Sequence, residues 1–236
     1  MSCVGIVGGL GVGATVDYYE RITAQCKARG VVPDLVLVHA DVDRGQGFVR
    51  AGQLDALAEY LLGFIERLAR AGATAAALPA VTPHICIDRI VARSPLPMID
   101  IVATIGAGLR ARKLRRMALF GTTFTMQGSL WGQLAQHAPD VEIVKPQPDE
   151  IAFVGQAYQR LLDTQQGDDA DTAGLRRIAA DLQRRDGVES ILLAGTDLAV
   201  IFTEENAGFP AIDVARLHIA AIVERLANDR TKNASS

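Results

Sequence analysis

Three side chains in the sequence stand where a proton-transfer group could work, and two of them follow predicted strands. His84 comes shortly after the apolar segment 73–78, and Asp197 follows the apolar segment 190–193. Ligands of parallel α/β proteins bind outside the carboxyl ends of the strands, so an imidazole or a carboxylate there could act as a general acid or base. The third, His218, lies in a predicted closing helix, and we expect it either to support a site residue from behind or to be structural.

A glycine-rich turn, GGLGVG at residues 8–13, follows the first predicted strand and precedes a helical segment. It could bind a dinucleotide, hold a small carboxylate on amides at the helix N-terminus, or be a tight turn only. The glycines do not have the G-x-G-x-x-G spacing, and no acidic residue directly ends the second predicted strand, 35–39. We therefore favour a carboxylate-binding loop that uses Gly9, and a plain turn stays open.

The three cysteines are Cys3, Cys26 and Cys86, an odd number with no C-x-x-C pair. This usage predicts incidental thiols in a reducing cytoplasm and neither a disulfide framework nor a zinc site. Cys3 opens a predicted strand and Cys26 lies on a predicted helix. We expect Cys86, at the start of a helix, to pack as a small hydrophobic side chain.

Apolar strand-like segments alternate with helical patterns along the whole chain. The segment 54–70, for example, brings Leu57, Leu61, Ile65 and Leu68 to one helical face. Strands separated by crossover helices predict parallel sheets with helices on both faces. The predicted strands are 4–8, 35–39, 73–78 and 97–100, then 117–121, 141–145, 190–193 and 210–213.

The two halves of the chain resemble each other. Each opens with a strand, a small-residue turn and a helix (GIVGGLG, then ALFGTTF), and each later has a strand that runs into a small polar turn (LPAVTP, then LLAGTD). This duplication predicts an α/β fold of two pseudo-symmetric lobes, each a parallel sheet flanked by helices, with a cleft between them. We expect one lobe to comprise 1–97 and 210–236, with the last helix returning to it, and the other to comprise 98–209.

Composition restricts the partners of the protein. Of the 236 residues 49% are hydrophobic but only 5% aromatic, and the net charge is −3. The densest basic cluster, residues 113–116, is short and leads into a strand, so we expect a solvated helix end and no nucleic-acid partner. The start has no signal-peptide pattern, and no apolar stretch approaches the 18 or more residues of a membrane span, so we expect a cytoplasmic protein without membrane contact.

Four segments, in order, resemble the aspartate/glutamate racemase superfamily on its aspartate-racemase side. They are GIVGGLGVGATVDYYERI, GTTFTM, VEIVKPQPDE and PAIDVARLHIAAIVERL, and together they extend over nearly the whole chain. The resemblance implies two α/β lobes with the active site between them and a small amino or dicarboxylic acid as substrate. It also implies that the protein acts without a cofactor or metal and, as is common in the family, forms a homodimer.

The resemblance further implies two catalytic cysteines, and this chain has neither. In such racemases one thiolate removes the α-proton and another reprotonates the opposite face, from the motifs P-C-N-T-x-H and G-C-T-E. Here LPAVTPH is similar to the first with Ala80 at the cysteine position, and LAGTDL to the second with Gly195 there. Asp197 matches the glutamate and is the better candidate base, with His84 the other. Ala80 could be an engineered replacement of a catalytic cysteine. However, glycine at position 195 would be an unusual second replacement, so we favour a natural branch of the family without the two thiols.

The resemblance also implies substrate contacts. Arg44 matches the arginine that holds a distal carboxylate, a task suited to the bidentate guanidinium. Alternatively, it is a surface residue paired with Asp41 or Asp43. Threonine hydroxyls and strand-end amides would complete a carboxylate site. The expected substrate-binding residues are Gly9, Arg44, Val81, Thr82, Thr122, Thr123 and Thr196.

Two functions follow as hypotheses. The first is isomerase-like or lyase chemistry at the α-carbon of a small acid, without the two-thiol mechanism. The second is a catalytically inactive protein that binds a small carboxylate. Since both thiols are missing, the sequence leaves open whether the chain is an enzyme.

Overall fold

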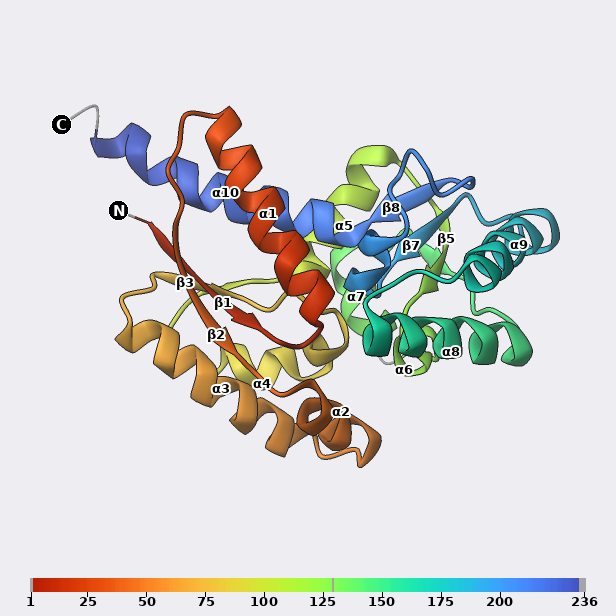
Figure 1. The fold of residues 1–236 in the computed structure, drawn as a ribbon, viewed down its shortest axis with the longest axis horizontal. Helices are drawn as coiled ribbons and strands as arrows, with labels where there is room; N and C mark the ends of the chain where they lie inside the picture. Colours follow the sequence, from red (N-terminus) through yellow and green to blue (C-terminus); the bar gives the residue numbers. More distant parts are fainter. Residues whose placement is uncertain (1, 129, 234–236) are drawn as a thin grey trace. The chain divides into compact units, whose positions relative to one another are not determined.

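The computed structural model describes residues 2–128 and 130–233 and falls into two compact units (Figure 1). Unit 1 combines the chain up to Ile101 with the chain from His218 onward. Unit 2 comprises Val102–Leu217. The divisions fall at the start of one helix and inside the last helix.

Unit 1 is built on a parallel sheet in the order β2-β1-β3-β4. Every residue of the central strand β1 is buried, because strands on both sides and helices on both faces cover it. The strands are β1 (Cys3–Gly8), β2 (Asp34–His39), β3 (Ala75–Ala77) and β4 (Met98–Ile99). The helices are α1 (Val12–Ala28), α2 (Val42–Arg50), α3 (Leu54–Arg70), the 3-10 helix η1 (Thr82–Cys86) and α4 (Ile87–Val91).

Helix α3 covers one face of this sheet with the apolar stripe that the sequence predicts. Leu57, Leu61, Ile65 and Leu68 are all buried. Gly5 in β1 permits the close approach, since a Cβ there would lie 2.8 Å from Cδ1 of Leu68. A tight helix–sheet contact of this kind holds the strand ends in fixed positions.

Unit 2 repeats the arrangement, with a parallel sheet in the order β6-β5-β7-β8. Its core includes Phe120, Phe202 and Phe209, which meet edge to face. The strands are β5 (Arg116–Phe120), β6 (Glu142–Ile143), β7 (Ser190–Leu193) and β8 (Ala211–Asp213). The helices are α5 (Ile101–Arg112), α6 (Thr123–Met126), α7 (Trp131–His137), α8 (Pro148–Thr164), α9 (Asp169–Asp186) and the 3-10 helix η2 (Thr196–Val200). The last helix, α10 (Val214–Asn233), begins in unit 2 and belongs to unit 1 from His218 onward.

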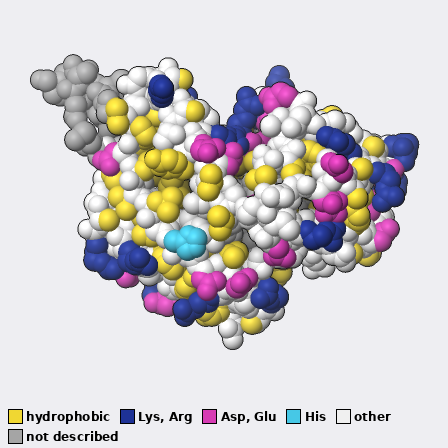
Figure 2. Space-filling view, in the orientation of Figure 1, with side chains coloured by type: hydrophobic (Ala, Val, Ile, Leu, Met, Phe, Trp, Pro, Cys, Tyr) yellow, Lys and Arg dark blue, Asp and Glu magenta, His cyan; other side chains and the backbone are white. Residues whose placement is uncertain are grey.

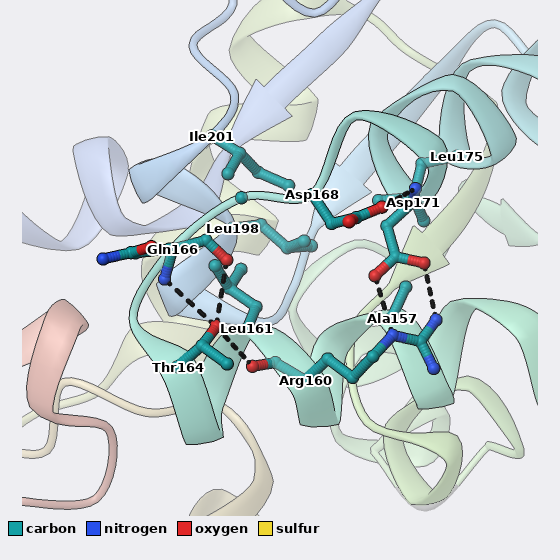
Figure 3. A pocket seen from close by; sticks show the side chains of 11 residues that line it. Ala157, Arg160, Leu161, Thr164, Gln166, Asp168, Asp171, Leu175, Leu198 and Ile201 are labelled. Atoms are coloured by element: carbon teal, nitrogen blue, oxygen red, sulfur yellow. Dashed lines mark hydrogen bonds and ion pairs between the residues drawn. The ribbon is translucent and has the colours of Figure 1, made fainter.

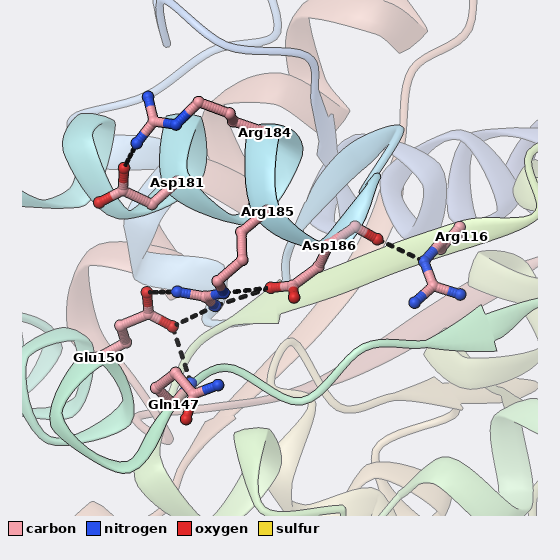
Figure 4. A network of polar contacts seen from close by, with 7 residues as sticks. All are labelled: Arg116, Gln147, Glu150, Asp181, Arg184, Arg185 and Asp186. Carbon is pink, nitrogen blue, oxygen red and sulfur yellow. Dashed lines mark hydrogen bonds and ion pairs between the residues drawn. The ribbon is translucent and has the colours of Figure 1, made fainter.

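A polar network ties the start of α8 to the end of α9 (Figure 4). Arg185 donates to both oxygens of Glu150, at 2.8 and 3.1 Å, and to Asp186 at 2.7 Å. Glu150 in turn accepts from the backbone N–H of Gln147 at 2.7 Å, within a capping box. Glu150 is 9% exposed while the Arg185 side chain is 38% exposed, so this bidentate pair is shielded from water on the Glu150 side only. It links α9 to the start of α8, the helix that carries Tyr158.

The predicted fold class is confirmed: the chain is α/β, with two four-stranded parallel sheets flanked by helices. The two sheets have the same strand order, with the first strand of each unit inside the sheet. The internal similarity of the sequence halves thus corresponds to two copies of one topology.

Strand pairing differs from the boundaries expected at 97/98 and 209/210. Residues of β4, Met98–Ile99, pair with β3 and so belong to the sheet of unit 1. Residues of β8, Ala211–Asp213, pair with β7 and so belong to the sheet of unit 2. Each boundary therefore lies after a fourth strand that completes its sheet, which the spacing of apolar segments does not reveal.

Two local features depend on single residues. The segment 41–44 starts helix α2, because the Asp41 carboxylate caps it by accepting from the N–H groups of Asp43 and Arg44. Two helices, α6 and α7, follow β5, with Gly128 between them at a φ of 106°. None of the helices in the described part is both long and apolar enough to cross a membrane.

Candidate active site

The glycine turn of unit 1 is held by the side chain of Thr15 in helix α1. Gly9 has a φ of 81°, and a Cβ there would lie 2.2 Å from the carbonyl oxygen of Ala40, so only glycine fits. Its N–H donates to Oγ1 of Thr15 at 3.0 Å, and that hydroxyl donates to the carbonyl of Gly11 at 2.7 Å. The Gly9 amide therefore already has a partner, and a carboxylate would have to displace it or use other amides.

Arg44 lies in the first turn of α2, directly after the carboxyl end of β2, and is exposed. Its guanidinium carbon stands 4.9 Å from the centre of the Tyr60 ring and 5.9 Å from that of Phe48. Within residues 2–128 and 130–233 it forms no ion pair with Asp41 or Asp43, the alternative raised by the sequence. Stacking restrains the guanidinium plane and leaves its N–H edges for a ligand.

Beyond β3, the turn that carries the first motif is almost entirely enclosed. Ala80, at the first thiol position, is 8% exposed, and Val81 is 4% exposed. Thr82, which begins η1, is half-buried. Of the residues expected to bind substrate here, Thr82 is therefore less buried than Val81.

His84 lies in η1 and is completely buried. Its Nδ1 lies 2.9 Å from the carbonyl oxygen of Ala80, which can only accept, so Nδ1 carries the proton. Its Nε2 has no hydrogen-bond partner among the described residues and faces Oδ1 of Asp100 at 3.8 Å. Burial lowers the pKa of His84, and the nearby Asp100 opposes this shift. The imidazole is thus a neutral, enclosed group in this structure.

His218 of α10 is a second completely buried imidazole in unit 1. Its Nε2 donates to the carbonyl of Ile99 at 2.7 Å, and its Nδ1 accepts from the hydroxyl of Tyr18 at 3.1 Å. Burial, reinforced by the neighbouring His84, lowers the pKa of His218 to about 3. Both ring nitrogens are satisfied in the neutral form, which agrees with a structural role.

In unit 2 the turns after β5 and β7 touch through two glycines. A Cβ on Gly121 would lie 3.0 Å from the backbone nitrogen of Gly195. Thr122 caps α6 by accepting from the N–H of Thr125 at 3.1 Å, and Thr123 is exposed. Thr196, at the start of η2, is only 3% exposed. The two turns that carry these threonines are therefore adjacent in unit 2, and the threonines differ in exposure.

Asp197 is buried beside Tyr158, a residue that was not predicted from the sequence as part of the site. The hydroxyl of Tyr158, from α8, donates to Oδ2 of Asp197 at 3.1 Å, and the two residues are 6% and 1% exposed. The ring of Tyr158 also fills the second thiol position, since a Cβ on Gly195 would lie 2.3 Å from its Cε2. Burial and the adjacent Asp197 carboxylate raise the pKa of Tyr158 well above its usual value of 10, so it remains a donor.

Replacing Gly195 by alanine should destabilise the protein by about 1–3 kcal/mol, as overpacking of a dense core does. The φ of Gly195 is −95°, so the added methyl acts only by its contact with Tyr158. Urea unfolding measures the effect. Gly63→Ala, in the exposed middle of α3 with nothing within 4 Å, is the control and should be neutral or stabilising. An unchanged midpoint for Gly195→Ala would mean that the Tyr158 ring yields freely.

All three cysteines are free and buried, as packed thiols should be. Cys86 donates to the carbonyl of Pro83 at 3.2 Å. Burial is the main cause that raises the pKa of each thiol, to about 11 for Cys3 and Cys86. A thiolate is the reactive form, so none of the three is prepared to act as a base near neutral pH. The described residues also contain no group of three or more His, Cys, Asp or Glu that could hold a metal ion.

A separate cavity of about 140 Å³ opens in unit 2 between α8, α9 and η2 (Figure 3). Its floor is apolar, and Arg160 and Asp171 form a bidentate ion pair at its rim, with Nε to Oδ2 at 2.8 Å. It shares α8 and η2 with Tyr158 and Asp197 but contains none of the expected site residues. The lining residues are Ala157, Arg160, Leu161, Thr164, Gln166, Gly167, Asp168, Asp171, Leu175, Leu198 and Ile201.

Comparison with known proteins identifies the family. The profile of the Asp/Glu/Hydantoin racemase family matches residues 7–222, most of the chain. The chain belongs to this family. A provisionally assigned Asp/Glu racemase from Yersinia pestis has a similar structure, with a TM-score of 0.83 at 23% identity, over 96% of this chain and 99% of that one.

Two further family structures show the same fold at lower identity. An aspartate racemase homologue from Pyrococcus horikoshii OT3 has a TM-score of 0.80 at 22% identity, over 96% of this chain and all of that one. A glutamate racemase from Francisella tularensis, solved with D-glutamate, has a TM-score of 0.70 at 13% identity, over 97% and 82%. Racemases of this family therefore share the two-sheet α/β architecture described above.

Three residues of the candidate site, two tyrosines and one aspartate, were not predicted from the sequence. Tyr158 lies 39 residues before Asp197, Tyr60 lies 16 residues after Arg44, and Asp100 faces His84 from the end of another strand. Only Asp100 had a local signal, since it ends the predicted strand 97–100 as Asp213 ends the predicted strand 210–213. The tyrosines lie within amphipathic helices, where their spacing indicates packing.

Proposed function

We propose that this racemase-family protein binds a small amino or dicarboxylic acid and acts on its α-carbon through a single carboxylate base, Asp197, without thiols. The observation that carries the proposal is the side chain of Tyr158, which fills the thiol position beside Gly195 and donates to Asp197. A hydrogen bond from a group that stays protonated orients the carboxylate while leaving it free to accept a proton.

A mechanism with one base gives a different stereochemical outcome from a mechanism with two bases. Asp197 would take the α-proton, leaving a carbanion stabilised by the substrate carboxylate, and would return a proton to the same face. The α-hydrogen would then exchange with solvent while the configuration is retained. The alternative is a catalytically inactive protein that binds the same class of acid, and it predicts binding without exchange.

Binding itself would depend on Arg44. Its guanidinium is exposed, stacked on Tyr60 and at the carboxyl end of the sheet of unit 1, where ligands of parallel sheets bind. Thr82 lies at the same edge, beyond β3, and is half-buried. We propose that Arg44 holds a distal carboxylate and that Gly9, Val81, Thr82, Thr122, Thr123 and Thr196 form the remaining contacts, with His84 in a supporting role.

Arg44→Ala should weaken the binding of aspartate or a related dicarboxylate by about 1.5–3 kcal/mol, the range for hydrogen bonds to a charged group. Isothermal titration of the wild type and the variant measures this. Arg67→Ala is a matched control. Arg67 lies on helix α3, and its guanidinium carbon stands 5.4 Å from the centre of the Phe64 ring. Equal affinities of all three proteins would show that Arg44 has no part in binding.

The resemblance to the family supports three further proposals. We propose that the chain works without cofactor or metal, that it forms a homodimer, and that it acts in the cytoplasm. Its net charge of −3 favours a small-molecule ligand over nucleic acid.

A further inference from the structure

Strand β2 is an unusually long edge strand. It has six residues and lies at the end of its sheet, whereas the edge strands β4, β6 and β8 have two or three residues each. Proteins commonly protect edge strands by keeping them short, charged or covered. The middle of β2, Leu35–Val38, has no charged residue, proline or glycine, and Leu37 is 45% exposed.

The backbone of β2 presents alternate residues to the outside of the sheet. The N–H of Ala40 donates to the carbonyl of Gly8, so the even-numbered residues of β2 bond to β1. Leu35, Leu37 and His39 therefore direct their N–H and C=O groups outward. These outward groups have no bonding partner among the residues that the structure describes.

An apolar helix face continues from this edge. Val12, Val16 and Tyr19 form one stripe of α1 and are each about half exposed. Leu37 lies beside α1, because a Cβ on Gly8 would contact both Leu37 and Thr15. Figure 2 shows hydrophobic side chains gathered over this part of unit 1. We name the set Val12, Val16, Tyr19, Val32 and Leu37 the α1–β2 face.

We propose that the α1–β2 face joins two copies of this chain, with β2 antiparallel to β2 of the second copy about a twofold axis at Leu37. In an antiparallel pair, facing residues either both point toward the partner strand or both point away. The outward residues then face each other in pairs: Leu37 opposite Leu37 of the second copy, and Leu35 opposite His39. Each such pair exchanges two hydrogen bonds, which satisfies every outward group of the three residues.

Residues of β2 favour this register over the neighbouring one centred on Val36. A shift of the axis to Val36 would place His39 opposite Pro33, which has no N–H to donate, and would lose a hydrogen bond. With the axis at Leu37, His39 faces the neutral Leu35, so no like charges oppose each other. A twofold pairing also suits a homodimer, because the same surface is used on both copies. The inference is independent of the ligand proposed above.

Light scattering after size exclusion, on the full chain, gives the first test. The wild type should elute with twice the mass of one chain. Leu37→Lys would place two lysines opposite each other at the axis, so its dimer should dissociate at least tenfold more readily. Val91→Lys, at an exposed valine of α4, is the matched control and should remain dimeric. A monomeric wild type at ~100 µM, or a dimeric Leu37→Lys protein, would overturn the proposal.

Cross-linking tests the register without adding charge. Facing residues of a hydrogen-bonded antiparallel pair have Cα atoms about 5.5 Å apart, within the range for a disulfide. Mild oxidation of Leu37→Cys should therefore give a covalent dimer, while the parent protein, whose three thiols are buried, and Val91→Cys should not. A covalent dimer from Val36→Cys in place of Leu37→Cys would show that the register is wrong.

Discussion

Aspartate and glutamate should keep their configuration in the presence of this protein. Ala80 and Gly195 stand at the two positions that the sequence resemblance matches to the thiols of the family, and neither side chain can accept or donate a proton. A general acid or base contributes about 10²–10⁴-fold to the rate, so losing both should leave racemisation near background. Proton NMR in D₂O, starting from each pure enantiomer, measures α-hydrogen exchange and inversion together.

The variants separate the possible outcomes. Exchange with retention that Asp197→Asn abolishes would support the single-base proposal, and binding without exchange would support the inactive alternative. Rapid inversion by the wild type would contradict both. Restoring the thiols with Ala80→Cys and Gly195→Cys should produce inversion only when Tyr158 is also shortened, for example to leucine, because its ring fills the space beside Gly195.

The protein should lose stability as the pH falls from about 6.5 towards 3. His218 has an ordinary pKa near 6.5 when unfolded, and burial lowers it to about 3 in the folded protein. Between these values the unfolded state binds the extra proton, so stability is complete above about pH 6.5 and decreases below it. The slope for one such group is at most about 1.4 kcal/mol per pH unit. His84, whose pKa is also lowered by burial, adds to the loss in the same direction.

Urea unfolding at several pH values between 7 and 4 measures this loss. His218→Gln should be less stable at pH 7, because it disturbs the contacts with Tyr18 and Ile99, but its stability should decline less steeply in acid. Carboxylates contribute equally in both proteins, so the difference in slope isolates the imidazole. Equal slopes for His218→Gln and the wild type would show that folding does not lower the pKa of His218.

The alternation of strands and helices could be predicted from the sequence because each element buries one apolar face. The stripe of α3 is clear in the order of its leucines. The short elements were harder to place. Strand β4 has two residues, and its sheet is decided by pairing with β3, a contact that no local pattern encodes. Helix α2 was missed because a nine-residue segment with two glycines has weak helical propensity, and its Asp41 cap decides the outcome.

The candidate site was predictable only as far as strand ends and family motifs extend. Those features indicated Arg44, His84 and Asp197, but not whether their side chains would be exposed. Arg44 is exposed, while His84 and Asp197 are enclosed. Contacts such as the one between Tyr158 and Asp197 join residues far apart in sequence, and they depend on how α8 lies against β7 and η2.

The contact between Gly195 and Tyr158 also couples the two positions genetically. With the aromatic ring in place, a cysteine at position 195 would have its Cβ 2.3 Å from a ring carbon, so this single substitution should be unfavourable. Introducing a thiol there would require a smaller residue at position 158 first, and that intermediate would leave Asp197 without its phenolic donor. The two positions are therefore epistatic: homologous chains that have the tyrosine should have a glycine at the position of Gly195.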